Sequence, residues 1–366
     1  MRDPKVVAAL QHKATQWTKL SKGLLVEKDP VKVLELTSHL LVVHPDPLYF
    51  WNHRRRALQQ QEAESPIDWQ EEFKLTQACL ERHPKAYGAW FHRKWCIMME
   101  SSSSTTSTPK KMAERFQKEL VLVSAFLERD ERNFHGWNYR RFVVSCLIIA
   151  NTNNDGTCDY NGGLDLEDDR LCLGPQVGNV VISSSGDPTE TSPQPLSPEV
   201  LEVIRSEFAF TTTKISQNFS NGSAFHYRAL LLPILLNAED DGGASSSLWE
   251  SELELVHNAL FTEPEDQTAW WYWEFLWDHH HHCTTKTTTV VELLETEANM
   301  LEELVEAEQG QTKWGLLGWQ QILKRLDQLG VKDNGNHNQK RKDILESLKR
   351  LDPDRKGRYT TMQKEL

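Results

Sequence analysis

Apolar residues recur at helical spacing in five stretches of this chain, and short polar segments follow each stretch. Between residues 31 and 43, for example, valine and leucine fall a few positions apart, as they do along one face of an α-helix. Proline and acidic residues come next, and these residue types end one helix and cap another. The pattern predicts five helical pairs, at about residues 30–60, 69–100, 115–150, 198–236 and 250–278.

A repeated motif marks the second helix of each pair, here called helix B, the first being helix A. An aromatic anchor stands in its first turn, and in the first four pairs an arginine follows three positions later. The anchors lie 39 to 47 residues apart, except for one doubled interval that contains an insert, and such a period is typical of arrays of helix pairs. The anchors are Trp51, Trp90, Trp137, Phe225 and Trp270, and the arginines are Arg54, Arg93, Arg140 and Arg228.

Stacking of these pairs predicts an all-α fold. One pair cannot cover its own apolar faces, whereas neighbouring pairs share a continuous core. We therefore expect a single helical-repeat domain over residues 1–366, an α-α superhelix in the form of a curved solenoid. Residues 290–351 keep weaker helical patterns and should form a degenerate sixth pair and a closing helix. Repetition also predicts that the anchors lie in the core and that the arginines pair with carboxylates of neighbouring helices.

Three polar segments interrupt the array, at residues 101–109, 151–197 and 279–289. They are rich in serine, threonine, glycine, aspartate and histidine, and hold too few apolar residues to form a core of their own. The sequence therefore predicts disordered surface loops at these positions.

The composition excludes several classes of function. The 366 residues carry a net charge of −12, whereas nucleic-acid binding depends on basic clusters. No apolar run approaches the roughly 18 residues of a membrane span, and the start of the chain has no secretory pattern. The six cysteines form no Cys-x-x-Cys pair, which indicates reduced thiols and a cytoplasmic location.

Several motifs resemble those of protein prenyltransferase α subunits, and those of the Rab geranylgeranyltransferase class most. They are Leu34–Ser38, Asp130–Val143, Asn218–Asn221 with His226–Arg228, and Asp266–Trp270, and the resemblance covers roughly residues 30–275 without the inserts. The chain departs from the family pattern at Phe225, which replaces the usual tryptophan, and at Trp273-Glu274, which replaces a basic pair.

The resemblance implies an α subunit that wraps a catalytic β subunit in an obligate heterodimer. Such an enzyme transfers a geranylgeranyl group from its diphosphate to C-terminal cysteines of Rab GTPases, which a Rab escort protein presents. The diphosphate would lie at the subunit interface, and zinc would belong to the β partner. We expect no metal on this chain, because its densest ligand cluster, His279–Cys283, lies in low-complexity sequence without fixed geometry.

Candidate site residues gather in the turns before helix B of the second and third pairs. Stacking places equivalent turns along one edge, where the unpaired N–H groups of each helix B also favour anions. Lys85, Tyr87, Arg132 and His135 could therefore converge on one anion site. By resemblance, Lys85 and His135 take the catalytic roles, beside a departing diphosphate. Tyr87, Phe134 and Arg132 would contact substrate, and Phe134 stands where farnesyl-type relatives carry a tyrosine, so that a hydroxyl is lost.

Structural roles for the same residues remain open from the sequence. Lys85 and Arg132 can be solvated surface charges, Tyr87 a hydrophobic staple, and His135 a cap of helix B. Two other functions also remain open. One is the α subunit shared by farnesyltransferase and geranylgeranyltransferase type I. The other is a non-enzymatic helical-repeat scaffold, although tetratricopeptide-like repeats are shorter, at about 34 residues.

Overall fold

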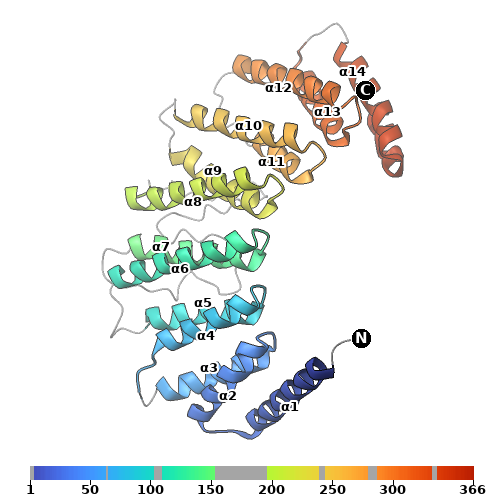
Figure 1. Cartoon of the computed structure of the whole chain (residues 1–366). Helices are drawn as coiled ribbons and strands as arrows, with labels where there is room; N and C mark the ends of the chain where they lie inside the picture. The colour runs from blue at the N-terminus through green and yellow to red at the C-terminus, as the bar shows by residue number, and fades with distance from the viewer. Residues whose placement is uncertain are drawn as a thin grey trace. The chain divides into compact units, whose positions relative to one another are not determined.

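The computed structural model describes residues 4–62, 65–102, 109–152, 196–238, 244–278, 287–331 and 336–366. Within these residues all regular structure is helical, and no strand occurs, so the all-α prediction is confirmed (Figure 1). None of the described helices is both long and apolar enough to cross a membrane. The chain divides into two compact units, Met1–Val200 and Leu201–Leu366.

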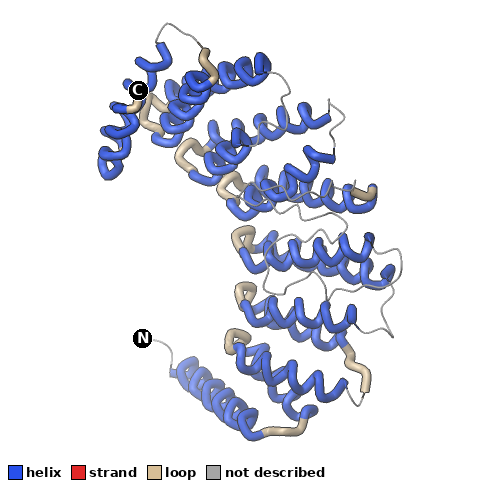
Figure 2. The backbone as a smooth tube through the Cα atoms, turned by 180° about the vertical axis from the view of Figure 1, so that it is seen from behind, coloured by secondary structure: helices blue, strands red, loops and turns tan. Residues whose placement is uncertain are grey.

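The first unit consists of a leading helix and three helical hairpins. Figure 2 shows the three turns within these hairpins one after another along the same edge. The leading helix, which the sequence patterns did not predict, packs on the first hairpin. The helices are α1 (Pro4–Val26), α2 (Pro30–Val43), α3 (Leu48–Glu62), α4 (Trp69–Arg82), α5 (Tyr87–Ser102), α6 (Pro109–Arg129) and α7 (Phe134–Thr152).

The second unit continues the same design with further hairpins and a short closing helix. Its last helix lies beyond the region where the sequence predicted helices. The helices are α8 (Pro198–Gln217), α9 (Gly222–Ala238), α10 (Ala244–Thr262), α11 (Gln267–Asp278), α12 (Thr287–Ala307), α13 (Lys313–Gln328), α14 (Asn336–Leu351) and α15 (Lys356–Lys364), with a 3-10 turn at Pro353–Arg355.

The observed hairpins lie at the positions where the sequence places helical pairs. The inserts were predicted too wide, because Ser101-Ser102, Pro109, Asn151-Thr152 and Thr287–Thr289 belong to helices. Leu196-Ser197, at the end of the second insert, form no regular structure, and residues 103–108, 153–195 and 279–286 lie outside the described residues. Whether all the pairs form one domain stays a prediction.

The tryptophan anchors fasten each turn to its helix B. Each anchor ring is buried, as predicted, and its indole N–H donates to a backbone carbonyl six residues earlier. The acceptors are Pro45, Pro84, Glu131 and Pro264, at 2.7 to 2.8 Å from the indole nitrogens of Trp51, Trp90, Trp137 and Trp270. Because a buried polar group without a partner is costly, the indole bond fixes how the chain enters the helix. Phe225 is equally buried but has no N–H to donate.

The repeated arginines join each hairpin to the next through buried ion pairs. Arg54 grips Glu72 of the next helix A with two hydrogen bonds of 2.7 and 2.6 Å. Its remaining guanidinium nitrogen, Nη1, donates to the Leu34 carbonyl and the Thr37 hydroxyl of its own helix A. One side chain therefore connects three helices. We call this arrangement an arginine joint.

The arginine joint recurs with the same chemistry. Arg93 grips Glu119 and also donates to the Phe73 carbonyl and the Thr76 hydroxyl. Arg228 binds Glu252 in the same manner and also donates to Phe208 and Thr211. The predicted pairing of the arginines with carboxylates of neighbouring helices is confirmed at these three positions. The fourth arginine, Arg140, is buried and donates to Ser124 at 2.7 Å.

In the fifth hairpin, where the motif lacks its arginine, Trp273 takes over the joint. The Trp273 indole N–H donates to the buried carboxylate of Glu297 on α12, which is again the next helix A. His257 on α10 lies 3.0 Å from the same carboxylate. The acid partner of the joint is therefore kept, although the donors differ.

Loss of the acid in a joint should destabilise the first unit strongly. Glu119→Gln leaves the Arg93 guanidinium buried without an opposite charge, so we expect the unfolding free energy to fall by about 3 kcal/mol. Chemical denaturation followed by circular dichroism measures this change. Glu71→Gln is the control, since its ion pair with Lys74 is exposed, and it should change stability little. Equal midpoints for the two variants would contradict the proposed importance of the joint.

Candidate functional site

The α4–α5 and α6–α7 turns are tied together at the edge of the first unit. Asn133 is buried and spans the two turns. Its side-chain oxygen accepts the Gly136 N–H at 3.3 Å, which caps α7, and its side-chain nitrogen donates to the Pro84 carbonyl at 2.8 Å. Lys85 adds an ion pair, with its Nζ 2.9 Å from Asp130 Oδ2. The two turns therefore hold each other by one neutral and one charged contact.

Aromatic rings meet at the starts of α5 and α7. The ring centroids of Tyr87 and His135 are 5.9 Å apart, and those of Phe134 and His135 are 3.9 Å apart. The exposed fractions of Tyr87 and Phe134 are 47% and 59%, which is high for rings of this size. Two open aromatic faces thus flank a half-buried histidine.

The structure thereby brings together most of the residues predicted from the sequence. Lys85 and Tyr87 come from the second hairpin, and Phe134 and His135 from the third, as the stacking of turns predicted. Arg132 is exposed on the α6–α7 turn and donates its backbone N–H to Asp130 Oδ1 at 3.2 Å. Its guanidinium makes no ion pair within the described part of the chain.

The local contacts also test two of the structural roles left open by the sequence, a helix cap for His135 and a hydrophobic staple for Tyr87. The side chain that caps α7 is that of Asn133, so the alternative of His135 as the cap is wrong. Tyr87 is the first residue of α5 and packs on Phe91 one helical turn later, with ring centroids 5.8 Å apart, which is a contact within the helix and not a staple from the residue before the cap. A packing role for Tyr87 therefore coexists with its exposure at the site.

Sequence reasoning missed Asp130 and Asn133. Both belong to the residue types that build turns and caps, and the Asp-x-x-Asn spacing before helix B was visible. Their contacts to Lys85 and Pro84 could not be read from the sequence, because the partners lie in another hairpin about 45 residues away.

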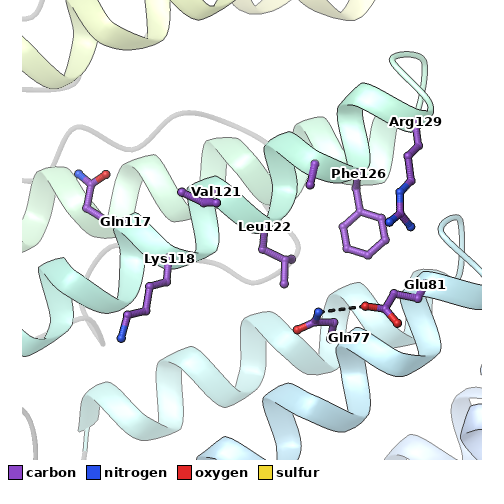
Figure 3. Close-up of a pocket in the computed structure, with 9 residues that line it drawn as sticks. Gln77, Glu81, Gln117, Lys118, Val121, Leu122, Phe126 and Arg129 are labelled. Carbon is purple, nitrogen blue, oxygen red and sulfur yellow. Dashed lines mark hydrogen bonds between the residues drawn. The ribbon is translucent and has the colours of Figure 1, made fainter.

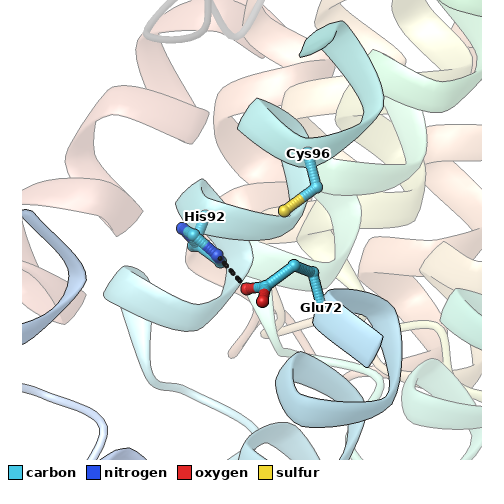
Figure 4. Close-up of side chains that lie close together, drawn as sticks. All are labelled: Glu72, His92 and Cys96. Carbon is cyan, nitrogen blue, oxygen red and sulfur yellow. Dashed lines mark hydrogen bonds and ion pairs between the residues drawn. The ribbon is translucent and has the colours of Figure 1, made fainter. Parts of the chain in front are cut away.

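A buried cluster of Glu72, His92 and Cys96 could be mistaken for a metal centre (Figure 4). Among the described residues, only these three place histidine, cysteine or carboxylate donor atoms within 4.8 Å of one another as a group. However, both oxygens of Glu72 are already taken by Arg54, and one of them also bonds His92. Burial raises the pKa of the Cys96 thiol well above its ordinary value, whereas zinc requires a thiolate.

The cluster is better explained as an arginine joint. In the next hairpin the Tyr139 hydroxyl donates to Glu119 at 2.7 Å, from the position that His92 occupies in its own hairpin. Tyr272 donates to Glu252 in the same way. The described residues therefore offer no ligand set that fits zinc, and residues 279–283, the other candidate, lie outside them. That this chain holds no metal stays a prediction.

In this joint Glu72 is ionised, whereas His92 is neutral near pH 7. Burial raises the pKa of Glu72, but hydrogen bonds from His92 and Arg54, together with the Arg54 charge, outweigh it and bring the pKa to about 2. Burial lowers the pKa of His92 to about 4, although Glu72 opposes this shift. Because Arg54 already neutralises Glu72, a second buried cation is unfavourable and His92 stays neutral near pH 7.

Acid should therefore destabilise the second hairpin through His92. The unfolded chain binds a proton at this histidine below about pH 6.5, whereas the folded chain does so only below about pH 4. Between these pH values proton binding therefore stabilises the unfolded state relative to the folded state. We expect the unfolding free energy to fall by about 3 kcal/mol over that range. His92→Tyr, which offers Glu72 a hydroxyl as Tyr139 does for Glu119, should remove this part of the slope. Thermal melts from pH 7 to pH 4 measure the change in stability with pH. The same pH dependence in the wild-type chain and in His92→Tyr would contradict the role of His92.

A groove lies between α4 and α6 (Figure 3). Its volume is about 510 Å³, and its floor includes Leu122 and Phe126. Arg129 and Glu81 stand at one end, as the close-up shows. No group of donor atoms or reactive side chains gathers in it, so the geometry favours the edge with Lys85 and His135 as the chemical site.

Known proteins match the same hairpins. The model for the protein prenyltransferase alpha subunit repeat matches residues 69–100, 116–147 and 204–235, which fall on the α4–α5, α6–α7 and α8–α9 hairpins. These repeats, together with the similarity of about two thirds of the chain to known α subunits, make the chain a member of the protein prenyltransferase α-subunit family.

Within that family, the chain is similar to proteins named geranylgeranyl transferase type-2 subunit alpha. It is 36% identical to the mouse protein over 253 residues, which are 67% of this chain and 33% of the relative. It is 28% identical to the Saccharomyces cerevisiae protein over 267 residues, 72% of this chain and 64% of the relative. The Schizosaccharomyces pombe protein is 26% identical over 347 residues, 91% and 85% of the two chains. This chain thus spans about a third of the mammalian relatives that it matches.

Proposed function

We propose that this chain is the α subunit of a heterodimeric Rab geranylgeranyltransferase, active only with a β subunit. The observation that carries the proposal is a pair of contacts across the tied turns of two hairpins, Lys85 with Asp130 and Tyr87 with His135. Both hairpins match prenyltransferase α-subunit repeats. The similarity to proteins named geranylgeranyl transferase type-2 subunit alpha supports the type of reaction.

In the proposed reaction, a C-terminal cysteine thiolate of a Rab GTPase attacks C1 of geranylgeranyl diphosphate. The new C–S bond replaces the C–O bond, and pyrophosphate leaves with the electron pair. Negative charge builds up on the departing oxygens, so preorganised positive charge lowers the barrier. Lys85 supplies that charge from an exposed side chain, and His135 and Arg132 add donors beside it. Helix α5 and helix α7 also begin here, and the positive end of a helix dipole favours an anion.

The exposed aromatic rings suit the apolar parts of the same substrate or of the partner. Tyr87 follows Lys85 by two residues and Phe134 follows Arg132 by two, and both rings are exposed, so a prenyl diphosphate could place its head on Lys85 and its first isoprene unit near the rings. We assign the isoprenoid tunnel and the zinc that activates the thiol to the β subunit, since the described residues here offer no fitting ligands. A Rab escort protein would present the GTPase. The buried free thiols Cys79, Cys96 and Cys146 are compatible with the cytoplasm, where we place the reaction.

Reconstitution tests this assignment. The chain alone should show no transfer of labelled geranylgeranyl, whereas the chain co-expressed with a type-2 β subunit should modify a full-length Rab when the escort protein is present. Efficient farnesylation of a bare four-residue CaaX peptide would instead indicate the α subunit shared by farnesyltransferase and geranylgeranyltransferase type I. Purification without any β-like partner would indicate a helical-repeat scaffold.

Removal of the lysine charge should slow the chemical step. Lys85→Ala in the αβ complex should lower the single-turnover rate roughly tenfold or more, because one donor to the leaving oxygens is lost. Assembly with β should be unaffected, because an obligate interface is large and one exposed lysine contributes little to it. Asp46→Ala, in the corresponding turn of the first hairpin, is the control and should change the rate little. A wild-type rate for Lys85→Ala would contradict the diphosphate role.

A further inference from the structure

Lys85 is not a free cation in the structure, because an acid from the next hairpin holds it. Lys85 lies in the α4–α5 turn and Asp130 in the α6–α7 turn, with 2.9 Å between Nζ and Oδ2. The lysine side chain is 67% exposed and the aspartate 29%. Asp130 is further fixed by the Arg132 N–H on its other oxygen, Oδ1. The aspartate is therefore the anchored partner, and the lysine is the one that can move.

This contact has consequences for an anion site. A carboxylate beside an ammonium group cancels most of its field, so the Lys85 charge is masked while the pair is closed. Exposed ion pairs are weak, however, and a diphosphate carries more charge than one carboxylate. Exchange of one anion for the other is therefore easy, although the Asp130 carboxylate repels the arriving diphosphate.

We propose that Asp130 is the resident counter-ion of Lys85, which holds the ammonium group at the edge between the two hairpins and gives it up to the diphosphate. This inference rests on the proposed function, since it assigns a partner to its central lysine. Asp130 acts only through Lys85, so it is a positioning residue. Its presence weakens the binding of both the substrate diphosphate and the pyrophosphate product, which favours product release.

The αβ complex carrying Asp130→Asn tests the proposal. The amide keeps an oxygen for the Arg132 N–H but removes the charge that pairs with Lys85. We expect inorganic pyrophosphate to bind about threefold more tightly, measured by calorimetry and as competitive inhibition, since an exposed ion pair no longer competes. The KM for geranylgeranyl diphosphate should fall by a similar factor, whereas kcat should not rise.

A double-mutant cycle separates this role from a structural one. In the Lys85→Ala background, Asp130→Asn should give no gain in pyrophosphate affinity, because the charge that it unmasks is absent. Glu131→Gln is the matched control, since it removes one negative charge from the neighbouring residue of the same turn, and it should give a smaller gain. If Asp130→Asn prevents assembly with β, Asp130→Ser keeps a hydroxyl acceptor for the turn and should give the same increase in affinity.

The outcomes can be told apart from a failure of the proposed function. Unchanged or weaker pyrophosphate binding by Asp130→Asn, in a complex that is active and still impaired by Lys85→Ala, would overturn the counter-ion role alone. An equal gain in the Lys85→Ala background would overturn it as well. A complex without transferase activity would overturn the proposed function, and the counter-ion role with it.

Discussion

The arginine joints are the interaction on which the rest of this structure depends. Arg54, Arg93 and Arg228 each bind a buried glutamate of the next hairpin, and each also binds a carbonyl of its own hairpin. Burial of two charges costs much of what their attraction returns, so such a pair is a poor source of net stability. Its effect is geometric, because a planar guanidinium with fixed donors allows one register between two hairpins. The joints specify how neighbouring repeats stack.

The candidate site also depends on this fixed register between neighbouring hairpins. The residues of the site come from two hairpins, and the contacts of Lys85 with Asp130 and of Tyr87 with His135 would be lost if the third hairpin slipped along the second. The joints place the helices. The Asn133 bond to Pro84 and the indole hydrogen bonds of the tryptophan anchors then fix the turns. A site at the edge of an array can therefore be precise although it lies on turns, because each turn is bonded to its own helix and to its neighbour.

The joints tolerate variation as long as the glutamate keeps its donors. His92, Tyr139 and Tyr272 all reach the carboxylate from the same position of helix B. In the fifth hairpin an indole replaces the guanidinium, and a histidine from helix A joins it. This exchange explains why the loss of the motif arginine in the fifth pair leaves a buried carboxylate with hydrogen-bond donors. The Glu72–His92–Cys96 cluster is explained in the same way, because Arg54 and His92 supply the hydrogen bonds of Glu72 and no metal is needed.

The sequence by itself determined the hairpins, the buried anchors and the pairing of the arginines, since apolar periodicity, turn residues and a repeated motif are local signals. It also placed Lys85 and His135 on one edge, because equivalent positions of stacked repeats must align. Only the tertiary structure decided which glutamate each arginine binds, that Asn133 rather than His135 caps α7, and that Asp130 holds Lys85. Those contacts join residues that are far apart in the chain, and the choice among many possible acids depends on distances that form only when the hairpins pack.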